Sequence, residues 1–533
     1  LDPITKEEVI SALKKQKSKA ASTTGLSPWD LKQLTDSVSN RLTSLFNTFF
    51  DSMTFAEDWL ESKMFYLHKK GSKSDPNNFR SINIQNPFLK TFSTILARRL
   101  STFAEMNGLL PNFQFGFRRQ RSTVAAAALL HEVVNSRLKD GKKTYACFID
   151  FSKAFDKVDR TLLFEKLQRL SIPYKFCSIL FTIFNSTKIF IQSGLYISEP
   201  FCSNIGTPQG DAISAILFSL FLSDIEDYIP DIGPMLNGVR IKMIMFADDI
   251  VLLAESANDL QKVIDASNRY CVQNKLEVNI SKTKCMIFHR GRRPQSTFKY
   301  NGQKIEIVNS FKYLGFTFTV QLSFTRHLEG QIAKAKSRIG QLFSKLPIMN
   351  LSLDRALKLF HVFITPIFIY GAPMYISRCS DSMMRSLDAV QTKFLKRYMS
   401  IPPWCNNSIT HFISETIPLS SYIKSRIPFL TKGLVFPECM SGLQLSFLQG
   451  SEIPVNYNPL PEIPSSFWGS RKFDALPSDP FYRKKLCREI FDLNHTEICK
   501  IKTFHKFYET TCVCLFCGGH VHPYHERYCT GTH

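Results

Sequence analysis

The sequence has no long uninterrupted hydrophobic run. Its longest apolar stretch, LKLFHVFITPIFIY at 357–370, is interrupted by Lys358, His361 and Pro366 and is too short to predict a membrane span. We therefore expect a buried helix there and no membrane among the partners. A signal peptide is lacking as well, and the chain opens on Leu1 in an amphipathic pattern, as expected of a fragment of a longer protein.

Repeats and low-complexity tracts are also absent, which excludes solenoid and propeller folds. Cysteine is scarce, with 14 residues among 533, so the chain is not a disulfide scaffold and we expect an intracellular, reducing compartment. A chain of this length exceeds what one hydrophobic core organises, and roughly three or four subdomains are expected.

Acidic residues are in deficit. Asp and Glu number 45 against 67 Lys and Arg, which gives a formal charge of +22. Such a charge suits a polyanionic partner, either nucleic acid or an anionic membrane surface, and charge alone does not separate the two.

The hydrophobic pattern changes near Lys143. Residues 1–140 are predicted to be mainly helical, with a polar, turn-rich loop at 70–78. From Lys143 to about residue 318, short apolar strands (TYACFID, KIFIQSG, IKMIMFADDIVLLAE and KCMIFHR) alternate with helical stretches. This alternation predicts an α+β sheet domain.

Residues 327–346 carry apolar side chains at three- and four-residue steps, which predicts an amphipathic helix. Its other face is basic, with Lys334, Arg338 and Lys345 on one side. This face is either a solvated surface or a contact for a nucleic-acid duplex. Between 451 and 480 the composition shifts to Pro and Ser, which is typical of a linker.

Three acids stand in strongly apolar surroundings. Asp150 ends the strand of FID, while Asp248 and Asp249 lie between two apolar strand halves in MIMFADDIVLLA and are predicted to cap a β-hairpin. Phosphoryl transfer to a hydroxyl uses two divalent ions, and acidic oxygens suit magnesium. A lone Asp more often caps a turn or pairs with a Lys, but three such acids together favour a site that holds two Mg²⁺, mainly through Asp150 and Asp248.

The C-terminal tail offers a second metal site. Its ligands follow a C-x2-C-x7-H-x3-C order: Cys514, Cys517, His525 and Cys529. Thiolates with one imidazole favour one tetrahedral, structural Zn²⁺, which would order a tail too short to bury a core. The exact set could differ by one, because the same stretch holds Cys512, His520 and His522.

Several stretches together resemble reverse transcriptases. FIDFSKAFD, NIGTPQGDAISAILFSLFL and FADD resemble motifs A, B and C in the family's order. KKGSKSDPNNFRSINI, QFGFRRQRSTVAAA, EVNISKTKCMIF and FKYLGFTF resemble further blocks of the LINE-type, non-LTR retrotransposon branch, whose CCHC knuckle the tail also resembles. The resemblance covers about residues 1–400 and the tail. One departure is FRSI where the family usually has YRPI, which puts the rigidity of that loop in doubt.

The resemblance implies catalytic roles for individual residues. Asp150 and Asp248 would bind both Mg²⁺ ions, Phe151 would lend its backbone carbonyl, and Asp249 would lie beside them near the primer terminus. Lys282 matches a lysine proposed to protonate the departing pyrophosphate.

The resemblance also implies a nucleotide site. Phe155 would stack under the sugar and exclude a 2′-hydroxyl, although a core Phe is the alternative. Gln209 and Gly210 would lie against the incoming nucleotide and template, unless they form a simple strand-to-helix turn. Three cations are candidates for holding the triphosphate, or form a solvated basic loop: Lys69, Lys70 and Arg80.

For primer and template the resemblance points to Lys312 and Gly315 in FKYLG, where an ordinary hairpin with a buried Tyr313 is also compatible. The basic face of the 327–346 helix belongs to the same group. The implied architecture is a right-hand polymerase, with fingers and an N-terminal extension at 1–140, an antiparallel-sheet palm at 141–318, a helical thumb at 319–400, a connector at 401–507 and a zinc knuckle at 508–533.

The function implied is that of an RNA-directed DNA polymerase that copies element RNA by target-primed reverse transcription. Its partners would be template RNA, primer or target DNA and dNTPs, and its place of action the nucleus. Two alternatives stay open: a group II intron-type maturase, against which the zinc-ligand spacing argues, and a catalytically silent RNA-binding remnant, against which the retained acids argue.

Overall fold

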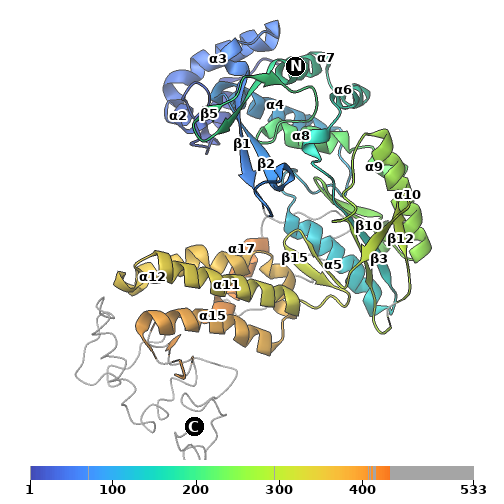
Figure 1. The fold of residues 1–533 in the computed structure, drawn as a ribbon, viewed down its shortest axis with the longest axis vertical. Coiled ribbons are helices and arrows are strands. Elements are labelled where there is room, and N and C mark those ends of the chain that lie inside the picture. The colour runs from blue at the N-terminus through green and yellow to red at the C-terminus, as the bar shows by residue number, and fades with distance from the viewer. Residues whose placement is uncertain are drawn as a thin grey trace, which may run out of the picture. The chain divides into compact units, whose positions relative to one another are not determined.

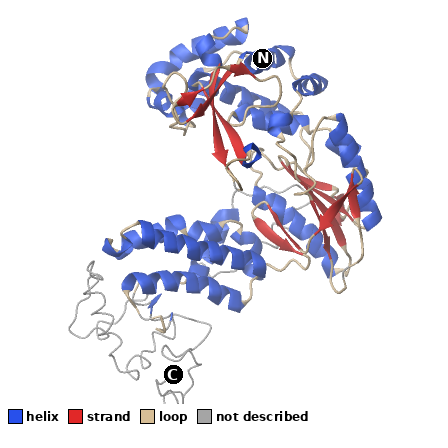
Figure 2. Cartoon of the chain, viewed as in Figure 1, coloured by secondary structure: helices blue, strands red, loops and turns tan. Residues whose placement is uncertain are grey.

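The computed structural model describes residues 2–69, 71–292 and 294–401, and between 403 and 431 it describes all but 406, 408, 409, 412, 413 and 415. Within these residues the chain forms two compact units. The first holds the residues up to Leu314 together with Val320–Leu322, and the second holds Gly315–Thr319 and the residues from Ser323 onward. Figure 2 shows helices and sheets in the first unit and mainly helices in the second, so the predicted mixed fold is confirmed.

The first unit opens with helices. They are α1 (Lys6–Lys14), α2 (Pro28–Gln33), α3 (Thr35–Ser52) and α4 (Pro87–Met106). α1 begins at a capping box, in which the side chain of Thr5 accepts from the Glu8 N–H and the Glu8 carboxylate accepts from the Thr5 N–H. α1 packs against α3 and α4, and the fully buried rings of Phe46 and Phe92 contact each other within this layer.

A sheet interrupts the region that the sequence predicts to be mainly helical. Its strands are β1 (Glu61–His68), β2 (Phe79–Gln85), β4 (Lys188–Ser193), β5 (Tyr196–Ile197) and β6 (Phe201–Cys202). β1 pairs antiparallel with β2 and parallel with β4, so KIFIQSG joins this sheet and not the one that holds the acids. The helical prediction for 1–140 was wrong for β1 and β2, because the most buried positions of these strands hold the polar residues Ser62, Asn83 and Gln85.

The remaining elements of the first unit surround a second sheet. The helices are α5 (Thr123–Lys139), α6 (Arg160–Arg169), α7 (Tyr174–Ser186), α8 (Ala212–Phe221), α9 (Ile225–Tyr228) and α10 (Ala257–Gln273). The strands are β3 (Thr144–Ile149), β7 (Met235–Leu236), β8 (Val239–Arg240), β9 (Met243–Phe246), β10 (Asp249–Ala254), β11 (Lys284–Phe288), β12 (Phe298–Tyr300), β13 (Gln303–Ile307) and β14 (Ser310–Tyr313).

The second sheet has six strands in the order β12-β13-β11-β3-β10-β9. All its pairs are antiparallel except β11 with β13. Every residue of β3 is buried, because α10 covers one face of the sheet and α5 covers the other (Figure 1). Burial on both faces explains why β3 and its neighbours are continuous apolar runs, in which acids occur only at strand ends.

The second unit contains the strand β15 (Phe316–Thr319) and a group of packed helices: α11 (Thr325–Lys345), α12 (Leu353–Phe363), α13 (Thr365–Ile369), α14 (Ala372–Tyr375), α15 (Asp381–Met399) and α17 (Leu419–Thr431). The amphipathic helix predicted at 327–346 is confirmed as α11. Its apolar face, including Leu328 and Ile339, is buried, and α11 packs against α13 and α15. Lys334, Arg338 and Lys345 lie on its exposed face.

The apolar stretch at 357–370 is not the single buried helix that the sequence predicts. Pro366 lies in the first turn of α13, so the stretch divides into α12 and α13, and Val362 is 63% exposed. Among the described residues no single helix is long and apolar enough to cross a membrane, although the bent pair Leu353–Ile369 and Ala372–Arg378 passes the same length and composition criteria.

We predict that Gly371→Ala destabilises the second unit by about 2–5 kcal/mol. Gly371 has φ +69°, and an added Cβ would lie 2.1 Å from the Phe316 ring, which is fully buried and stacked on Tyr370. Urea unfolding measures the change. The matched control is Gly340→Ala on α11, where a Cβ meets nothing within 4 Å and the helix should gain about 1 kcal/mol. Equal stability of the two variants would contradict the prediction.

Candidate active site

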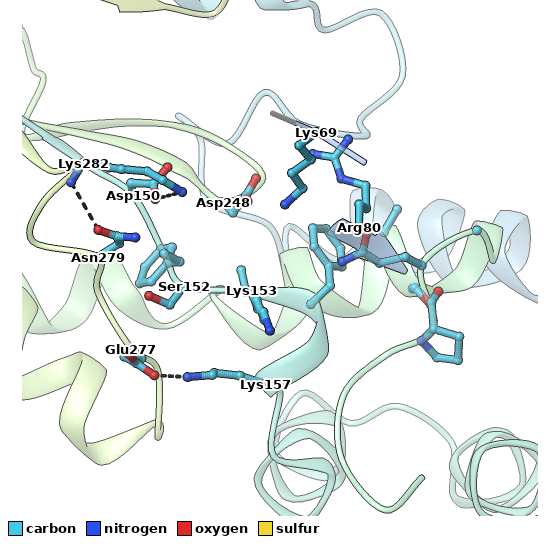
Figure 3. A pocket seen from close by; sticks show the side chains of 18 of the residues that line it. Lys69, Arg80, Asp150, Ser152, Lys153, Lys157, Asp248, Glu277, Asn279 and Lys282 are labelled. Atoms are coloured by element: carbon cyan, nitrogen blue, oxygen red, sulfur yellow. Dashed lines mark hydrogen bonds and ion pairs between the residues drawn. The ribbon is translucent and has the colours of Figure 1, made fainter. Parts of the chain in front are cut away.

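A cleft of about 900 Å³ in the first unit gathers most of the residues to which the sequence analysis gave catalytic or nucleotide-binding roles (Figure 3). The predicted residues that line it are Asp150, Phe151, Asp248, Lys282, Lys69, Arg80, Phe155, Gln209 and Gly210. These residues come from five separate stretches of the chain. The fold therefore brings the quoted motifs to one place.

The three acids lie at one end of the six-stranded sheet. Asp150 directly follows β3, whose last residue, Ile149, pairs with Ile250 of β10, so Asp150 comes opposite Asp249 in register. The hairpin predicted at the two acids is present: β9 and β10 pair up to Phe246 and Asp249, leaving Ala247 and Asp248 as a two-residue turn.

These carboxylates influence one another. Burial raises the pKa of Asp248, and the charge of Asp150 raises it further. Desolvation by the surrounding protein, followed by the charges of Asp248 and Asp150, raises the pKa of Asp249 to about 6. The three carboxylates therefore lie within electrostatic range of one another.

Asp150 is held by its backbone. Its N–H donates to Thr283 Oγ1 at 3.2 Å, and its carbonyl accepts from the Asn279 N–H at 2.7 Å. Its side-chain Oδ2 is buried and accepts no hydrogen bond, and Lys282 Nζ lies 3.4 Å from it. A buried carboxylate oxygen without a hydrogen-bond donor is costly unless a cation occupies the space beside it.

The donor set fits magnesium. Mg²⁺ usually takes one or two carboxylates and completes its octahedron with water and substrate phosphates. Asp150 and Asp248 supply the carboxylates. The backbones of Asp150 and Ser152 form hydrogen bonds with Asn279 and Glu277, whereas the carbonyl of Phe151, between them, takes no part in this pairing. Among the described residues no group of three or more His, Cys, Asp or Glu side chains could hold a metal by itself, so substrate oxygens would have to complete the coordination.

Cations face the acids across the cleft. Arg80 pairs with Leu67 in the β1–β2 ladder, and Lys69 N–H donates to the Asn78 carbonyl at 2.8 Å just beyond it. Burial, followed by the charges of Arg80 and Lys282, lowers the pKa of Lys69. Figure 3 shows Lys69 and Arg80 on one side of Asp248 and Lys282 on the other. An anion could bind beside Lys69 and Arg80, because both side chains are cationic donors.

Phe155 and the 206–211 loop form the rest of the lining. The Phe155 ring stacks on Phe218 with centroids 4.5 Å apart. Gln209 Nε2 donates to Asp156 Oδ1 at 3.1 Å, and the Gln209 carbonyl accepts from the Asn83 N–H at 2.8 Å. Gly210 has φ +116°, and a Cβ there would lie 2.6 Å from the Asn83 carbonyl oxygen, so only glycine permits this approach.

Several residues that line or support the cleft were not predicted, and three of them stand out. Phe117 and Lys153 line the cleft, and Phe117 is 54% exposed with its ring near Phe155. Arg160 is 7% exposed and donates to the carbonyls of Phe184, Ser203 and Gly206, which fastens the segment before Gln209. A signal existed for Lys153, within FSKAFD, and for Phe117, within QFGF. No sequence pattern marks Arg160, whose acceptors are mainly backbone carbonyls, with Asn185 Oδ1 in addition.

Other predicted residues lie elsewhere. Lys312 is exposed on β14 and does not line the cleft. Gly315, with φ +88°, belongs to the second unit, where a Cβ would lie 2.7 Å from the Tyr370 ring. The three cations of α11 are also in the second unit. Lys70 and the four zinc ligands, Cys514, Cys517, His525 and Cys529, lie outside the described residues.

We predict that Asp249→Asn changes how the stability of the metal-free protein depends on pH. With a folded pKa near 6 against an ordinary 3.8, Asp249 keeps a proton in the folded state that the unfolded state has released between about pH 4 and 6. The free energy of unfolding therefore falls as pH rises through this range, and the variant should fall less steeply. Denaturant titrations in EDTA measure this, with the exposed Asp140→Asn as control. Parallel curves for wild type and Asp249→Asn would contradict the prediction.

Comparison with known proteins places this site in a family. Residues 67–318 match the model described as "Reverse transcriptase (RNA-dependent DNA polymerase)". The chain is 24% identical over 424 residues to the probable RNA-directed DNA polymerase from transposon BS of Drosophila melanogaster, covering 77% of this chain and 46% of that protein. It is 27% identical over 415 residues to the RNA-directed DNA polymerase from mobile element jockey of Drosophila funebris, covering 76% and 44%. The chain thus spans less than half the length of these relatives.

Among solved structures, telomerase from Candida tropicalis in complex with a TWJ fragment of telomeric RNA aligns with a TM-score of 0.38 and 13% identity, covering 78% of this chain and 67% of that one. A TM-score this low does not establish a common fold. The family match and the sequence relatives agree with each other, and the lining of the cleft lies within the matched segment. Residues 67–318 are a reverse transcriptase domain.

Proposed function

We propose that the chain is the polymerase part of a non-LTR retrotransposon protein, which copies element RNA into DNA by target-primed reverse transcription. The observation that carries the proposal is the cleft in which Asp150 and Asp248 face Lys69 and Arg80. Such a cleft can hold a nucleoside triphosphate with its phosphates between the metal-binding acids and the cations. The relatives named as RNA-directed DNA polymerases support the same activity.

The chemistry is assigned to the acids. Asp150 and Asp248, with the Phe151 carbonyl, would hold two Mg²⁺, which would activate the primer 3′-hydroxyl and stabilise the leaving pyrophosphate. Asp249 would lie beside the primer terminus. Its pKa is raised by burial first and then by the charges of Asp248 and Asp150, which a bound cation would offset.

The cations would serve the phosphates. Arg80 offers a planar fork and Lys69 a compact charge for the triphosphate, and Lys70 is assigned to the same group from the sequence alone. Lys282, whose Nζ lies 3.4 Å from Asp150 Oδ2, would protonate the departing pyrophosphate. Its position at the rim next to Asp150 is compatible with this role.

The sugar and base of the incoming nucleotide would contact the wall of the cleft formed by Phe155, Gln209 and Gly210. The Phe155 ring, fixed by Phe218, would lie under the sugar, where a 2′-hydroxyl has no room. Gln209 and Gly210 would contact the nucleotide and the template base, with the Gln209 amide oriented by Asp156.

The wider architecture is proposed as a right hand, with fingers at 1–140, palm at 141–318, thumb at 319–400, a connector at 401–507 and a zinc knuckle at 508–533. The basic face of α11, with Lys312 and Gly315, would contact the primer–template duplex through its phosphates. One structural Zn²⁺ at the four C-terminal ligands would help to bind RNA or target DNA. Use of a nicked chromosomal primer implies action in the nucleus.

We predict that Asp150→Asn or Asp248→Asn lowers primer extension by at least about a thousandfold, because each removes a carboxylate from the two-ion site. RNA binding should persist, since it depends on many phosphate contacts. Extension of a DNA primer on an RNA template with Mg²⁺ and dNTPs measures the first, and filter binding the second. Asp265→Asn on the exposed side of α10 is the matched control. Near-normal extension by either site variant would refute the assignment, and an inactive wild type would favour a silent remnant.

We predict that Phe155→Val or Phe155→Ala admits ribonucleotides, because a smaller side chain leaves room for the 2′-hydroxyl. The ratio of kcat/KM for dNTP and rNTP should fall by about tenfold or more, a change of roughly 1.4 kcal/mol in discrimination. Phe181→Val on the surface of α7 is the control, because its ring is exposed and outside the cleft. Unchanged selectivity would remove Phe155 from this role.

A further inference from the structure

The turn that carries Asp248 is packed against a segment to which no role has been assigned. Residues 113–117 run parallel to β9, with the Phe115 N–H donating to the Met245 carbonyl at 2.7 Å and the Met245 N–H donating to the Phe113 carbonyl at 2.9 Å. The segment therefore pairs with β9 as a further strand and extends to the hairpin turn at Ala247 and Asp248.

The turn itself is in an unfavourable conformation. Ala247, the first of its two residues, has φ +56°, in the left-handed region that costs a residue with a Cβ of the order of 1 kcal/mol or more. Asp248 follows directly, so the direction of its carboxylate depends on Ala247 keeping this conformation. A strained residue of this kind persists only where its surroundings hold it.

The side chain of Gln114 holds it. Gln114 is fully buried, and its Oε1 accepts hydrogen bonds from the Ala247 N–H at 3.0 Å and from the Gly116 N–H at 2.8 Å. Because two N–H groups converge on this atom, it must be the amide oxygen and not the nitrogen. The amide nitrogen Nε2 is buried without a partner, so an apolar side chain would fill the space at less cost, and the benefit of Gln must come from its oxygen.

Gly116 brings the two backbones into contact. A Cβ at this position would lie 2.3 Å from the Ala247 nitrogen. The segment and the turn therefore touch directly, and Gln114 cannot shift without moving the turn. The Gln114 amide thus holds the backbone of Ala247, and the Ala247 backbone in turn orients Asp248.

We propose that Gln114 is a positioning residue that fixes the Asp248 carboxylate for divalent metal by holding Ala247 in its left-handed conformation. This inference rests on the proposed function of Asp248 as a metal ligand. Partners that orient a metal ligand commonly change metal affinity or activity by about 10–100-fold when they are removed. Gln114 touches neither substrate nor metal, so its effect should appear as a change in metal dependence.

The test is Gln114→Met in the full chain, which keeps the length of the side chain and removes the acceptor. The Mg²⁺ concentration that gives half-maximal primer extension should rise about tenfold, and RNA binding should stay as in wild type. Binding of Mn²⁺ alone, followed by the electron paramagnetic resonance of the free ion, should weaken by a similar factor. Gln391→Met is the matched control, because Gln391 is 2% exposed in α15 and its Oε1, unlike that of Gln114, lacks a hydrogen-bond partner.

A second variant separates positioning from packing. Ala247→Gly added to Gln114→Met should restore the metal dependence, because glycine adopts φ +56° without support. If Gln114→Met fails to fold, the double variant should fold and bind Mn²⁺. Unchanged Mn²⁺ affinity in a folded Gln114→Met, or a double variant that is no better than the single one, would overturn the proposal. The Mn²⁺ measurement needs no turnover, so an inactive wild type would count against the proposed function and not against this inference.

Discussion

Electrostatic repulsion among Asp150, Asp248 and Asp249 is the constraint on which the first unit depends. These acids end strands that are buried on both faces, and their carboxylates are brought together by the register of β3 with β10. The raised pKa values of Asp248 and Asp249 express the cost of that arrangement. A bound cation would offset the charge of these acids, as proposed above for Mg²⁺.

Backbone contacts, more than side-chain contacts, build the walls around this charge. The Thr207 N–H donates to the Phe155 carbonyl and the Gly206 N–H to the Val158 carbonyl, both at 2.8 Å, which ties the 206–211 loop to the segment after Asp150. Gly206 has φ +78°, and a Cβ there would lie 2.6 Å from the Asp156 carbonyl oxygen. This wall of the cleft is thus fixed by close approach of main chains, and the Arg160 guanidinium also donates to the Gly206 carbonyl.

The sequence predicted the parts of the molecule whose residue types leave few options. Two adjacent acids between apolar strand halves predicted the hairpin at Asp248, because such acids can approach one site only at a tight turn. An apolar stripe predicted α11, because burial of one helix face enforces a helical period. The sheet formed by β1, β2 and β4 escaped prediction, since pairing between Glu61 and Lys188 leaves no local signal. Arg160 escaped for a similar reason: its acceptors are mainly backbone carbonyl oxygens, which every residue possesses. The roles of Lys282, of the α11 cations and of the zinc ligands stay predictions.

The parallel pairing of β1 with β4 also governs how the chain can fold. β1 is made early, yet one of its two edges stays without a partner until the whole of β3, α6 and α7 has followed, because β4 comes only after them. During synthesis that edge is an open row of amide and carbonyl groups, which can recruit strands from other molecules. A ribosome pausing between β3 and β4 would hold the chain in its most aggregation-prone state, and any division of the domain at that point would leave two halves that each lack a neighbour.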